Sequence, residues 1–261
     1  MTKVVILCGG YGTRIRDVTE NLPKPMIPIG VYPILWHIMK YYATWGHNHF
    51  ILCIGYKGDV IRDFFINYRS HITDFSIDLS GSTPIEYHNT EMVENWNVTL
   101  AETGLNSMTG TRIKRIKNYL IGEENFMLTY GDGVGNIDIK KLFEFHQSHG
   151  KILTVTGVRP PGRFGELQCN EKGLVTEFNE KPQTSGGRIS GGFFVCSKKI
   201  FDYIDNREDN VFEQEPLRNL VTDGEVMVFK HDGFWQPMDT SREYHFLNKM
   251  YHQQKAPWVI W

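Results

Sequence analysis

The sequence has few cysteines, almost no excess of charge and no long apolar run, and each shortage narrows the possible functions. Its four cysteines form no Cys-x-x-Cys pair, a pattern that favours buried free thiols in a reducing cytosol: Cys8, Cys53, Cys169 and Cys196. The 28 Lys and Arg nearly balance the 30 Asp and Glu, so the chain lacks the basic surface of a general nucleic-acid binder. The early apolar stretch 4–8 is too short for a signal-peptide core, and no run approaches the roughly 18 apolar residues of a membrane span. We therefore expect a cytoplasmic protein that binds neither nucleic acid nor membrane.

What the sequence does contain is enough apolar mass for a packed core. Its 261 residues are 41% hydrophobic and 13% aromatic against 22% charged, which excludes wholesale disorder. This length fits one large α/β domain or two small ones. Because no repeat, low-complexity tract or linker interrupts the chain, we expect a single domain spanning 1–261.

Strand-like and helix-like segments alternate over the first 160 residues. Continuous strand patterns occupy 4–8, 50–54, 126–130 and 152–158, and helical faces occupy 33–42, 60–68, 111–120 and 139–149. The stretch 75–100 reads as short strands and loop. Alternation of this kind predicts a parallel sheet with helices on both faces and a ligand site at the carboxyl ends of the strands.

The pattern changes after residue 165. Runs at 166–169 and 174–178 flank a turn at 171–173 and predict a hairpin. A strand at 191–195, helices at 198–204 and 215–221, a strand at 226–229 and a helix at 242–251 follow. The predicted fold is therefore α/β, with a mixed, mainly parallel central sheet and an added β-hairpin region.

A glycine-rich loop directly follows the first strand. It reads Leu7, Cys8, Gly9, Gly10, Tyr11, Gly12, Thr13, Arg14. Three glycines within four positions let the backbone approach an anion and direct several N–H groups at it. The spacing matches neither the dinucleotide fingerprint, because Ile15 stands where a third glycine is needed, nor a Walker A loop. A tight structural turn is the alternative interpretation.

Charged residues of both signs accompany this loop. Arg14 and the proline-stiffened Lys24 would place fixed positive charge around a triphosphate, although Lys24 alone could be a solvated surface lysine. Asp132, flanked by glycines at a strand end, and Asp239 are candidate ligands of Mg²⁺, which takes one or two protein carboxylates and keeps several waters. An Asx-type turn would also explain Asp132, and spacing does not prove that the two converge.

Two other clusters carry weaker signals. His146 and His149 share a helix face, as metal ligands sometimes do. However, they lie in the last turn of the helix, where histidine interacts favourably with the helix dipole. Four basic residues lie on one predicted helix: Arg112, Lys114, Arg115 and Lys117. In a nearly neutral chain such a helix is expected to be a solvated face.

Together these motifs resemble those of the sugar-1-phosphate nucleotidylyltransferase family. The resemblance runs from residue 3 to about 240 and rests on the glycine loop with Arg14, Lys24-Pro25, Gly131-Asp132-Gly133, Glu180-Lys181-Pro182 and Gly191-Gly192-Phe193-Phe194-Val195. Within that family the segments 34–39, 55–58, 96–99, 103–104, 108–112, 160–165 and 234–240 look like those of cytidylyltransferases that act on glucose 1-phosphate, and Ala-Pro-Trp at 256–258 fits their C-terminus.

The resemblance implies a Rossmann-like nucleotidyltransferase fold, a Mg²⁺ requirement, CTP and a sugar 1-phosphate as substrates, a CDP-sugar product and a homo-oligomer. It implies a nucleotide-binding half at about 1–135, a sugar-binding half at about 136–240 and a C-terminal helix and tail at 241–261. Catalytic roles would fall to Arg14, Lys24, Asp132 and Lys181, and Asp132 and Asp239 would hold the metal. The nucleotide would contact Leu7, Cys8, Gly9, Gly10, Gly12, Thr13, Arg14, Lys24, Thr103, Gly104, Thr109, Arg112 and Tyr130. The sugar phosphate would contact Gly165, Glu180, Lys181, Ser190, Gly191, Gly192 and Trp235.

The segment 103–112 is the stretch that we expect over the base, because it combines small residues, hydroxyls and one strong donor, Arg112. One residue departs from the family pattern: Ser190 stands where those cytidylyltransferases usually carry Asn, which bears on the hexose and not on the phosphate chemistry. Two alternatives remain. One is a nucleotidylyltransferase for another base or sugar, and the other is a non-catalytic subunit of the same fold that senses sugar nucleotides.

Overall fold

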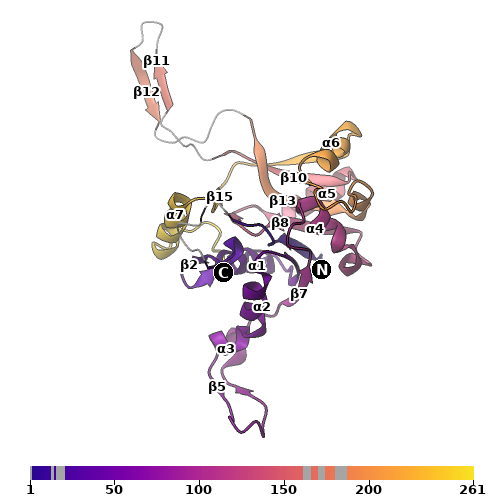
Figure 1. Cartoon of the computed structure of the whole chain (residues 1–261). Coiled ribbons are helices and arrows are strands. Elements are labelled where there is room, and N and C mark those ends of the chain that lie inside the picture. The colour runs from indigo at the N-terminus through magenta and orange to yellow at the C-terminus, as the bar shows by residue number, and fades with distance from the viewer. Residues whose placement is uncertain (1, 13–14, 16–20, 161–165, 170–173, 180–186) are drawn as a thin grey trace.

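The computed structural model describes residues 2–12, 15, 21–160, 166–169, 174–179 and 187–261. Seven strands of this described part form the central sheet, in the order β14-β10-β13-β8-β1-β4-β7 (Figure 1). Strand β13 runs antiparallel to its neighbours β8 and β10, and the other pairs are parallel. The predicted mixed, mainly parallel sheet is therefore confirmed. Its strands are β1 (Val4–Leu7), β4 (His49–Ile54), β7 (Asn97–Glu102), β8 (Asn125–Tyr130), β10 (Leu153–Val158), β13 (Ile189–Ser197) and β14 (Val226–His231).

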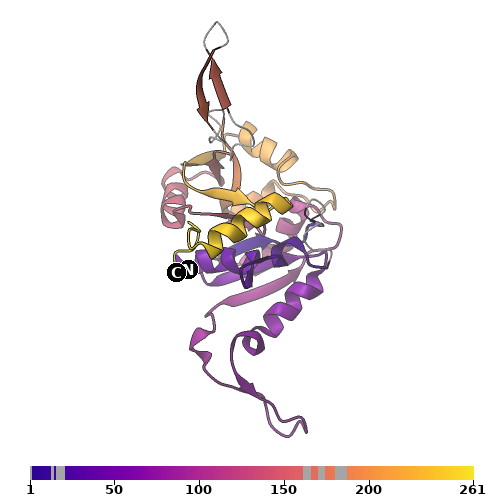
Figure 2. The same ribbon diagram turned by 90° about the vertical axis from the view of Figure 1, so that its left-hand side faces the viewer.

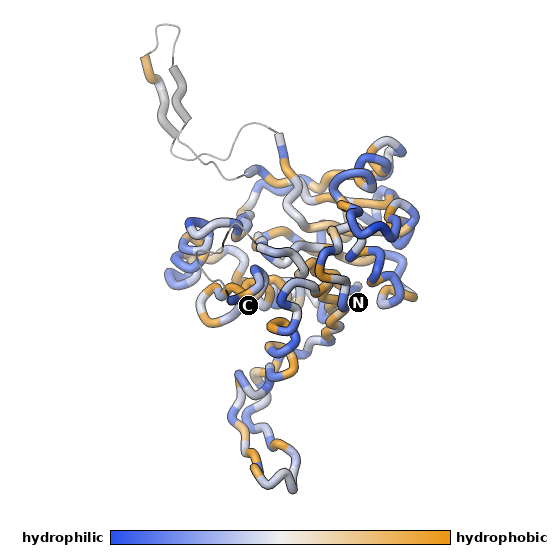
Figure 3. The backbone as a smooth tube through the Cα atoms, viewed as in Figure 1, coloured by the Kyte–Doolittle hydropathy of each residue, from blue (hydrophilic) through white to orange (hydrophobic). Residues whose placement is uncertain are grey.

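Apolar cores lie on both faces of this sheet. Along β1, Val4 and Ile6 face one core and Val5 and Leu7 face the other, because successive side chains of a strand point to opposite faces. The first core includes residues of α1 (Ile34–Thr44), α2 (Gly58–Ile66), α5 (Ile139–His149) and α7 (Ser241–His252). The second includes residues of α4 (Thr109–Arg115), α6 (Glu215–Thr222) and the 3-10 helices η4 (Lys117–Leu120) and η5 (Lys198–Asp202). Hydrophilic residues predominate on the peripheral helices α6 and α7 (Figure 3).

Smaller elements surround this body. Two-stranded pairs are formed by β2 (Pro28–Ile29) with β3 (Tyr32–Pro33), β5 (Phe75–Ser76) with β6 (Glu86–Tyr87), β9 (Gly133–Gly135) with β15 (Trp235–Pro237), and β11 (Glu166–Cys169) with β12 (Val175–Asn179). The short helices are η2 (Lys24–Met26), α3 (Tyr68–Ile72) and η3 (Thr90–Met92). The β5–β6 and β11–β12 pairs project at opposite ends of the molecule (Figures 1 and 2). None of the described helices is both long and apolar enough to cross a membrane.

Most predicted elements are present, and the hairpin and α5 fall where the pattern places them. Two predicted helical stretches are confirmed but are not continuous α-helices. The helix expected over 111–120 is α4 followed by η4, and the one expected over 198–204 is the 3-10 helix η5. Over one or two turns the apolar pattern of a 3-10 helix does not differ from that of an α-helix.

Candidate active site

The candidate site lies where parallel strands end. Strands β1, β4, β7 and β8 run in the same direction, so the segments that follow them meet at one edge of the sheet. These segments border a pocket of about 400 Å³, a volume typical of small-molecule sites. Its lining includes Leu7, Cys8, Gly9, Gly10, Tyr11, Gly12, Lys24, Pro25, Leu105, Asn106, Ser107, Met108, Thr109, Arg112, Tyr130, Gly131, Asp132 and Asp239.

The glycine loop forms one wall of this pocket. Gly12 has φ 59°, a left-handed conformation that glycine adopts at little cost. A Cβ atom at Gly9 would collide with the guanidinium of Arg112, whereas one at Gly10 would meet no atom within 4 Å. The loop therefore needs glycine at two positions for different reasons, backbone angle and close approach. Thr13 and Arg14, which we expected to complete it, lie outside the described residues.

Two carboxylates and one ammonium converge on the same side of the pocket. Lys24 Nζ lies 2.6 Å from Asp132 Oδ2 and also contacts Asp239 Oδ1. Burial lowers the pKa of Lys24, but the charge of Asp132 and hydrogen bonds to both aspartates outweigh it and raise the pKa above its usual value. The ammonium is therefore charged at neutral pH and offsets the repulsion between the carboxylates.

The chain brings these aspartates together through a short strand pair. Asp132 directly precedes β9, and Asp239 follows β15 by two residues. The two strands are antiparallel, with Pro237 opposite Gly133, and Met238 N donates to Asp132 O at 2.8 Å. Residues 107 positions apart thereby lie side by side, a convergence that sequence spacing could not establish.

This pair of carboxylates fits a hard divalent cation. The side chains of Asp132 and Asp239 are 33% and 26% exposed, which leaves room for the waters that Mg²⁺ retains. No group of three or more His, Cys, Asp or Glu suited to a metal occurs within the described ranges. Two carboxylates with water are thus the donor set that this part of the chain offers at the pocket.

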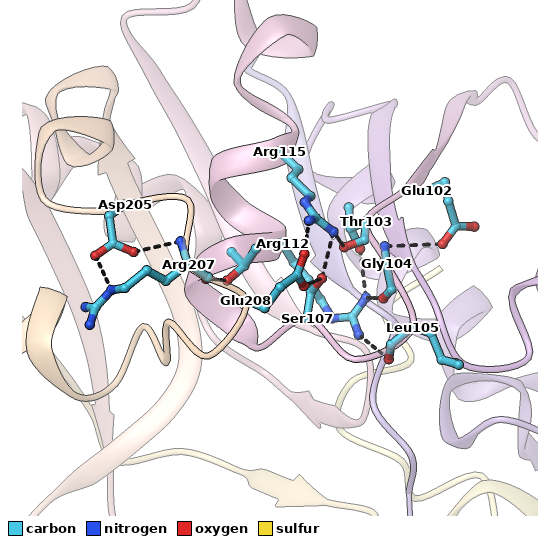
Figure 4. A network of polar contacts seen from close by, with 11 residues as sticks. Glu102, Thr103, Gly104, Leu105, Ser107, Arg112, Arg115, Asp205, Arg207 and Glu208 are labelled. Carbon is cyan, nitrogen blue, oxygen red and sulfur yellow. Dashed lines mark hydrogen bonds and ion pairs between the residues drawn. The ribbon is translucent and has the colours of Figure 1, made fainter.

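Arg112 lines the pocket, but its guanidinium forms hydrogen bonds with other residues of the protein (Figure 4). Its Nη1 donates to Thr103 Oγ1 at 2.8 Å, to the carbonyl of Gly104 at 2.7 Å and to that of Ile54 at 3.3 Å. Its Nη2 donates to the carbonyls of Gly9 at 3.0 Å and Leu105 at 3.3 Å. The guanidinium therefore ties the glycine loop to the segment 103–105, and its Nη groups are not the free donors to a base that we expected.

Two further residues of the expected base-binding segment do not face the pocket. Thr103 is fully buried and donates to the carbonyl of Ile54 at 2.8 Å, and the amide of Gly104 contacts Glu102 Oε1 at 3.2 Å. Neither lines the cavity, whereas Thr109 does. Thr103 and Gly104 instead provide acceptors for Arg112 behind the lining residues.

The basic helix is only partly the solvated face that we expected, because Arg115 and Lys117 are exposed whereas Arg112 is buried and Lys114 half-buried. Arg115 donates to the carbonyl of Thr103 at 2.8 Å and to Ser107 Oγ at 2.7 Å, and it pairs with Glu208. Lys114 donates to the carbonyl of Phe201 at 2.5 Å. A charge pattern alone does not reveal these acceptors, because they come from segments distant in sequence.

A smaller cavity adjoins the main pocket and shares Tyr130 and Asp132 with it. Its other lining residues include four that we expected on the sugar side: Ser190, Gly191, Gly192 and Trp235. Trp235 Nε1 donates to the carbonyl of Gly191 at 2.7 Å. Gly192 has φ 74°, and a Cβ there would collide with the ring of Tyr130. Gly165, Glu180 and Lys181 lie outside the described residues.

Several lining residues were not expected individually. Leu105, Asn106, Ser107 and Met108 fall inside the predicted base-binding segment, and Tyr11 falls inside the glycine loop. Tyr11 donates its hydroxyl to Asn106 Oδ1 at 2.6 Å and so links the two segments. The position of Tyr11 among the loop glycines was the one feature of the sequence that could have identified it as a lining residue.

The cysteines and the histidine pair of the sequence analysis lie in surroundings that indicate structural roles. Cys8, Cys53 and Cys196 are buried free thiols, as expected, and burial raises the pKa of Cys53 to about 12. Both His146 Nδ1 and His149 Nε2 contact Thr154 Oγ1, at 2.8 and 2.7 Å. These histidines hold a shared hydroxyl, and neither belongs to a larger metal-type cluster of described residues.

Comparisons with known proteins agree with this architecture. Residues 3–254 match the family model described as Nucleotidyl transferase. The chain is 49% identical over 259 residues to the glucose-1-phosphate cytidylyltransferase of Salmonella typhi, with 99% of each chain covered. It is 45% identical to the probable glucose-1-phosphate cytidylyltransferase of Bacillus subtilis, covering 99% of this chain and 100% of that one. The crystal structure of HddC from Yersinia pseudotuberculosis is similar with a TM-score of 0.68 and 27% identity, over 96% of this chain and 100% of that chain. The predicted nucleotidyltransferase fold is confirmed, and the chain belongs to the nucleotidyl transferase family.

Proposed function

We propose that this protein transfers a cytidylyl group from CTP to glucose 1-phosphate, giving CDP-glucose and pyrophosphate. The observation that carries the proposal is its 49% identity, over 99% of both chains, to a glucose-1-phosphate cytidylyltransferase. Two adjoining cavities that share Asp132 support it, because the reaction joins two substrates at one phosphorus atom.

The larger pocket takes the nucleotide in this proposal. Backbone N–H groups of the glycine loop, together with Lys24 and Arg14, bind the triphosphate and stabilise the departing pyrophosphate. The segment 105–109 lies over the base, with Thr109 at its end. Leu7, Cys8 and Tyr130 complete the walls. Arg112 acts indirectly, by holding the glycine loop against the segment 103–105.

The smaller cavity takes the sugar. Gly191, Gly192 and Trp235 shape it, and Ser190 contributes a hydroxyl in place of the amide that the resemblance leads one to expect. Lys181 binds the phosphate of the sugar substrate, and Glu180 and Gly165 contact the hexose. The sugar phosphate already carries a nucleophilic oxygen, so the protein has to align it with the α-phosphorus and neutralise charge rather than provide a nucleophile of its own.

Asp132 and Asp239 would hold Mg²⁺. Bound there, the ion would neutralise charge on the phosphate oxygens during transfer. Lys24 keeps the two carboxylates together and is close enough to contribute its own positive charge.

We also propose that the chain is one domain whose halves meet at the site, and that it acts as a cytoplasmic homo-oligomer. Tyr130 and Asp132 of the first half line the smaller cavity with Ser190 and Trp235 of the second. Light scattering of the purified protein would test the oligomer.

The activity is tested by pyrophosphate release with a panel of nucleoside triphosphates and hexose 1-phosphates. Turnover with CTP and glucose 1-phosphate above all other pairs is expected. A better pair would indicate another base or sugar. Binding of a sugar nucleotide without turnover of any pair would indicate a non-catalytic sensing subunit, which is disfavoured because Arg14, Lys24, Asp132, Lys181 and Asp239 are all present.

A further inference from the structure

A segment between η5 and α6 holds the nucleotide side of the site from outside. This brace segment, residues 207–213, lies against the lining segment 105–109 (Figure 4). Met108 N donates to the carbonyl of Glu208 at 2.9 Å, and Gly110 N donates to that of Asn210 at 2.9 Å. The Glu208 carboxylate accepts from Ser107 Oγ at 2.6 Å.

The last residue of the brace segment, Glu213, contacts two lining side chains. Its Oε2 accepts from Thr109 Oγ1 at 2.7 Å, and its Oε1 accepts from the hydroxyl of Tyr130. Thr109 Oγ1 in turn accepts from Phe212 N at 2.9 Å. Glu213 is not itself among the described residues that line the pocket, and within the described part of the site it makes contact through these two hydroxyls.

Tyr130 borders both cavities, so its position affects both substrates. Its ring lies directly against Gly192, where no Cβ could fit, and makes an edge contact with Phe194 at 5.9 Å between ring centroids. The hydroxyl end of the same ring is held by Glu213. The ring is thus fixed between the sugar side and the brace segment.

We propose that Glu213 is a positioning residue that holds Thr109 and Tyr130 at a fixed separation and so sets the junction between the nucleotide and sugar pockets. The proposal rests on the proposed function for the assignment of the two pockets. A carboxylate suits this role, because its two oxygens accept from two hydroxyls at once.

Kinetics of Glu213 variants test the proposal. Loss of two hydrogen bonds to a charged group should lower kcat/KM for both substrates by about 5- to 30-fold in Glu213→Ala, with little change in Tm because the side chain is exposed. Glu213→Gln keeps one acceptor and one polar contact, so it should recover most of the activity. Asp209→Ala removes a carboxylate from the same segment that makes no hydrogen bond or ion pair with a described residue, and it should behave as wild type.

Double variants separate positioning from a general structural effect. Tyr130→Phe should lower kcat/KM for both substrates, whereas Thr109→Val should lower it for the nucleotide alone. In the double variant, Tyr130→Phe should add little to the loss caused by Glu213→Ala, because both substitutions break the same contact. Three results would overturn the proposal. They are near-wild-type kinetics of Glu213→Ala, losses in kcat/KM that multiply in the double variant of Glu213→Ala with Tyr130→Phe, and a loss in Asp209→Ala equal to that in Glu213→Ala. If Glu213→Ala unfolds, the proposal is decided by whether Tyr130→Phe lowers kcat/KM for both substrates while Thr109→Val lowers it for the nucleotide alone. All assays use the nucleotide that wild type prefers, so a preference other than CTP would overturn the proposed function and leave the role of Glu213 to be decided by the same variants.

Discussion

Replacing Arg112 by methionine should destabilise the protein and not merely weaken nucleotide binding. Methionine keeps an unbranched chain of similar length but provides no donor. The substitution leaves four carbonyls and the hydroxyl of Thr103 without the guanidinium that joins them, in a region where the arginine is only 4% exposed.

The magnitude follows from the number and burial of these contacts. A buried acceptor left without its donor costs about 1–3 kcal/mol of folding free energy, so loss of a guanidinium that serves five buried or half-buried acceptors should cost about 3–5 kcal/mol. For a chain of this size that loss lowers Tm by roughly 6–20 °C, because each kcal/mol shifts the midpoint by about 2–4 °C. Burial also lowers the pKa of Arg112, but an arginine remains protonated at neutral pH.

Calorimetry of wild type and variants measures the effect. Arg112→Lys should fall between wild type and Arg112→Met, since a single ammonium cannot replace a planar fork of five donors. Arg62→Met is the matched control, because Arg62 makes an exposed pair with Glu102 that is worth at most about 1 kcal/mol. An unchanged Tm in Arg112→Met with a large increase in KM for CTP would refute the scaffold role and restore Arg112 as a direct ligand of the base.

Three further predictions concern the metal ligand, the sugar side and the core. Asp132→Asn should reduce turnover by about 100-fold or more at saturating Mg²⁺ with Tm nearly unchanged, and activity above about a tenth of wild type would indicate a turn residue only. Gly192→Ala should raise KM for the sugar phosphate because its Cβ meets Tyr130, whereas Gly187→Ala, which meets no atom within 4 Å, should not. Burial lowers the pKa of His37 to about 4, so its neutral form contributes stability above pH about 6.5 that is lost as the pH falls toward 4. Urea unfolding should show that the free energy of unfolding falls by about 2 kcal/mol between pH 7.5 and 5 because of this group, and His37→Gln should show a smaller fall. An equal dependence of the unfolding free energy on pH in both proteins would contradict the prediction.

The sheet could be predicted because its strands carry strong local signals. Val4–Leu7 and Asn125–Tyr130 are mostly apolar and are followed within two residues by glycine, and both fall within a residue of their predicted bounds. Edge strand β7 was harder, because only Ala101 of its six residues is fully buried and its pattern therefore has little contrast.

The charged groups of the site could be identified from sequence, but their partners could not. Lys24 and Asp132 stand out beside proline and glycine, yet their contact joins residues 108 positions apart. The same holds for Arg112, whose acceptors come from other segments. Glu213 was not identified from the sequence at all, because only its contacts with Thr109 and Tyr130 distinguish it from other surface carboxylates. A chemical type can be read locally, whereas a hydrogen-bond partner is determined by the tertiary fold.

The most direct test of the cytidylyl assignment is the ratio of kcat/KM for CTP to that for UTP, measured by pyrophosphate release with glucose 1-phosphate. Cytosine offers an amine donor where uracil offers a carbonyl, and a buried group left unpaired costs about 1–3 kcal/mol. CTP should therefore be preferred by roughly 10- to 100-fold. Comparable values for the two nucleotides would contradict the assignment to cytidylyl transfer and leave only membership of the wider family.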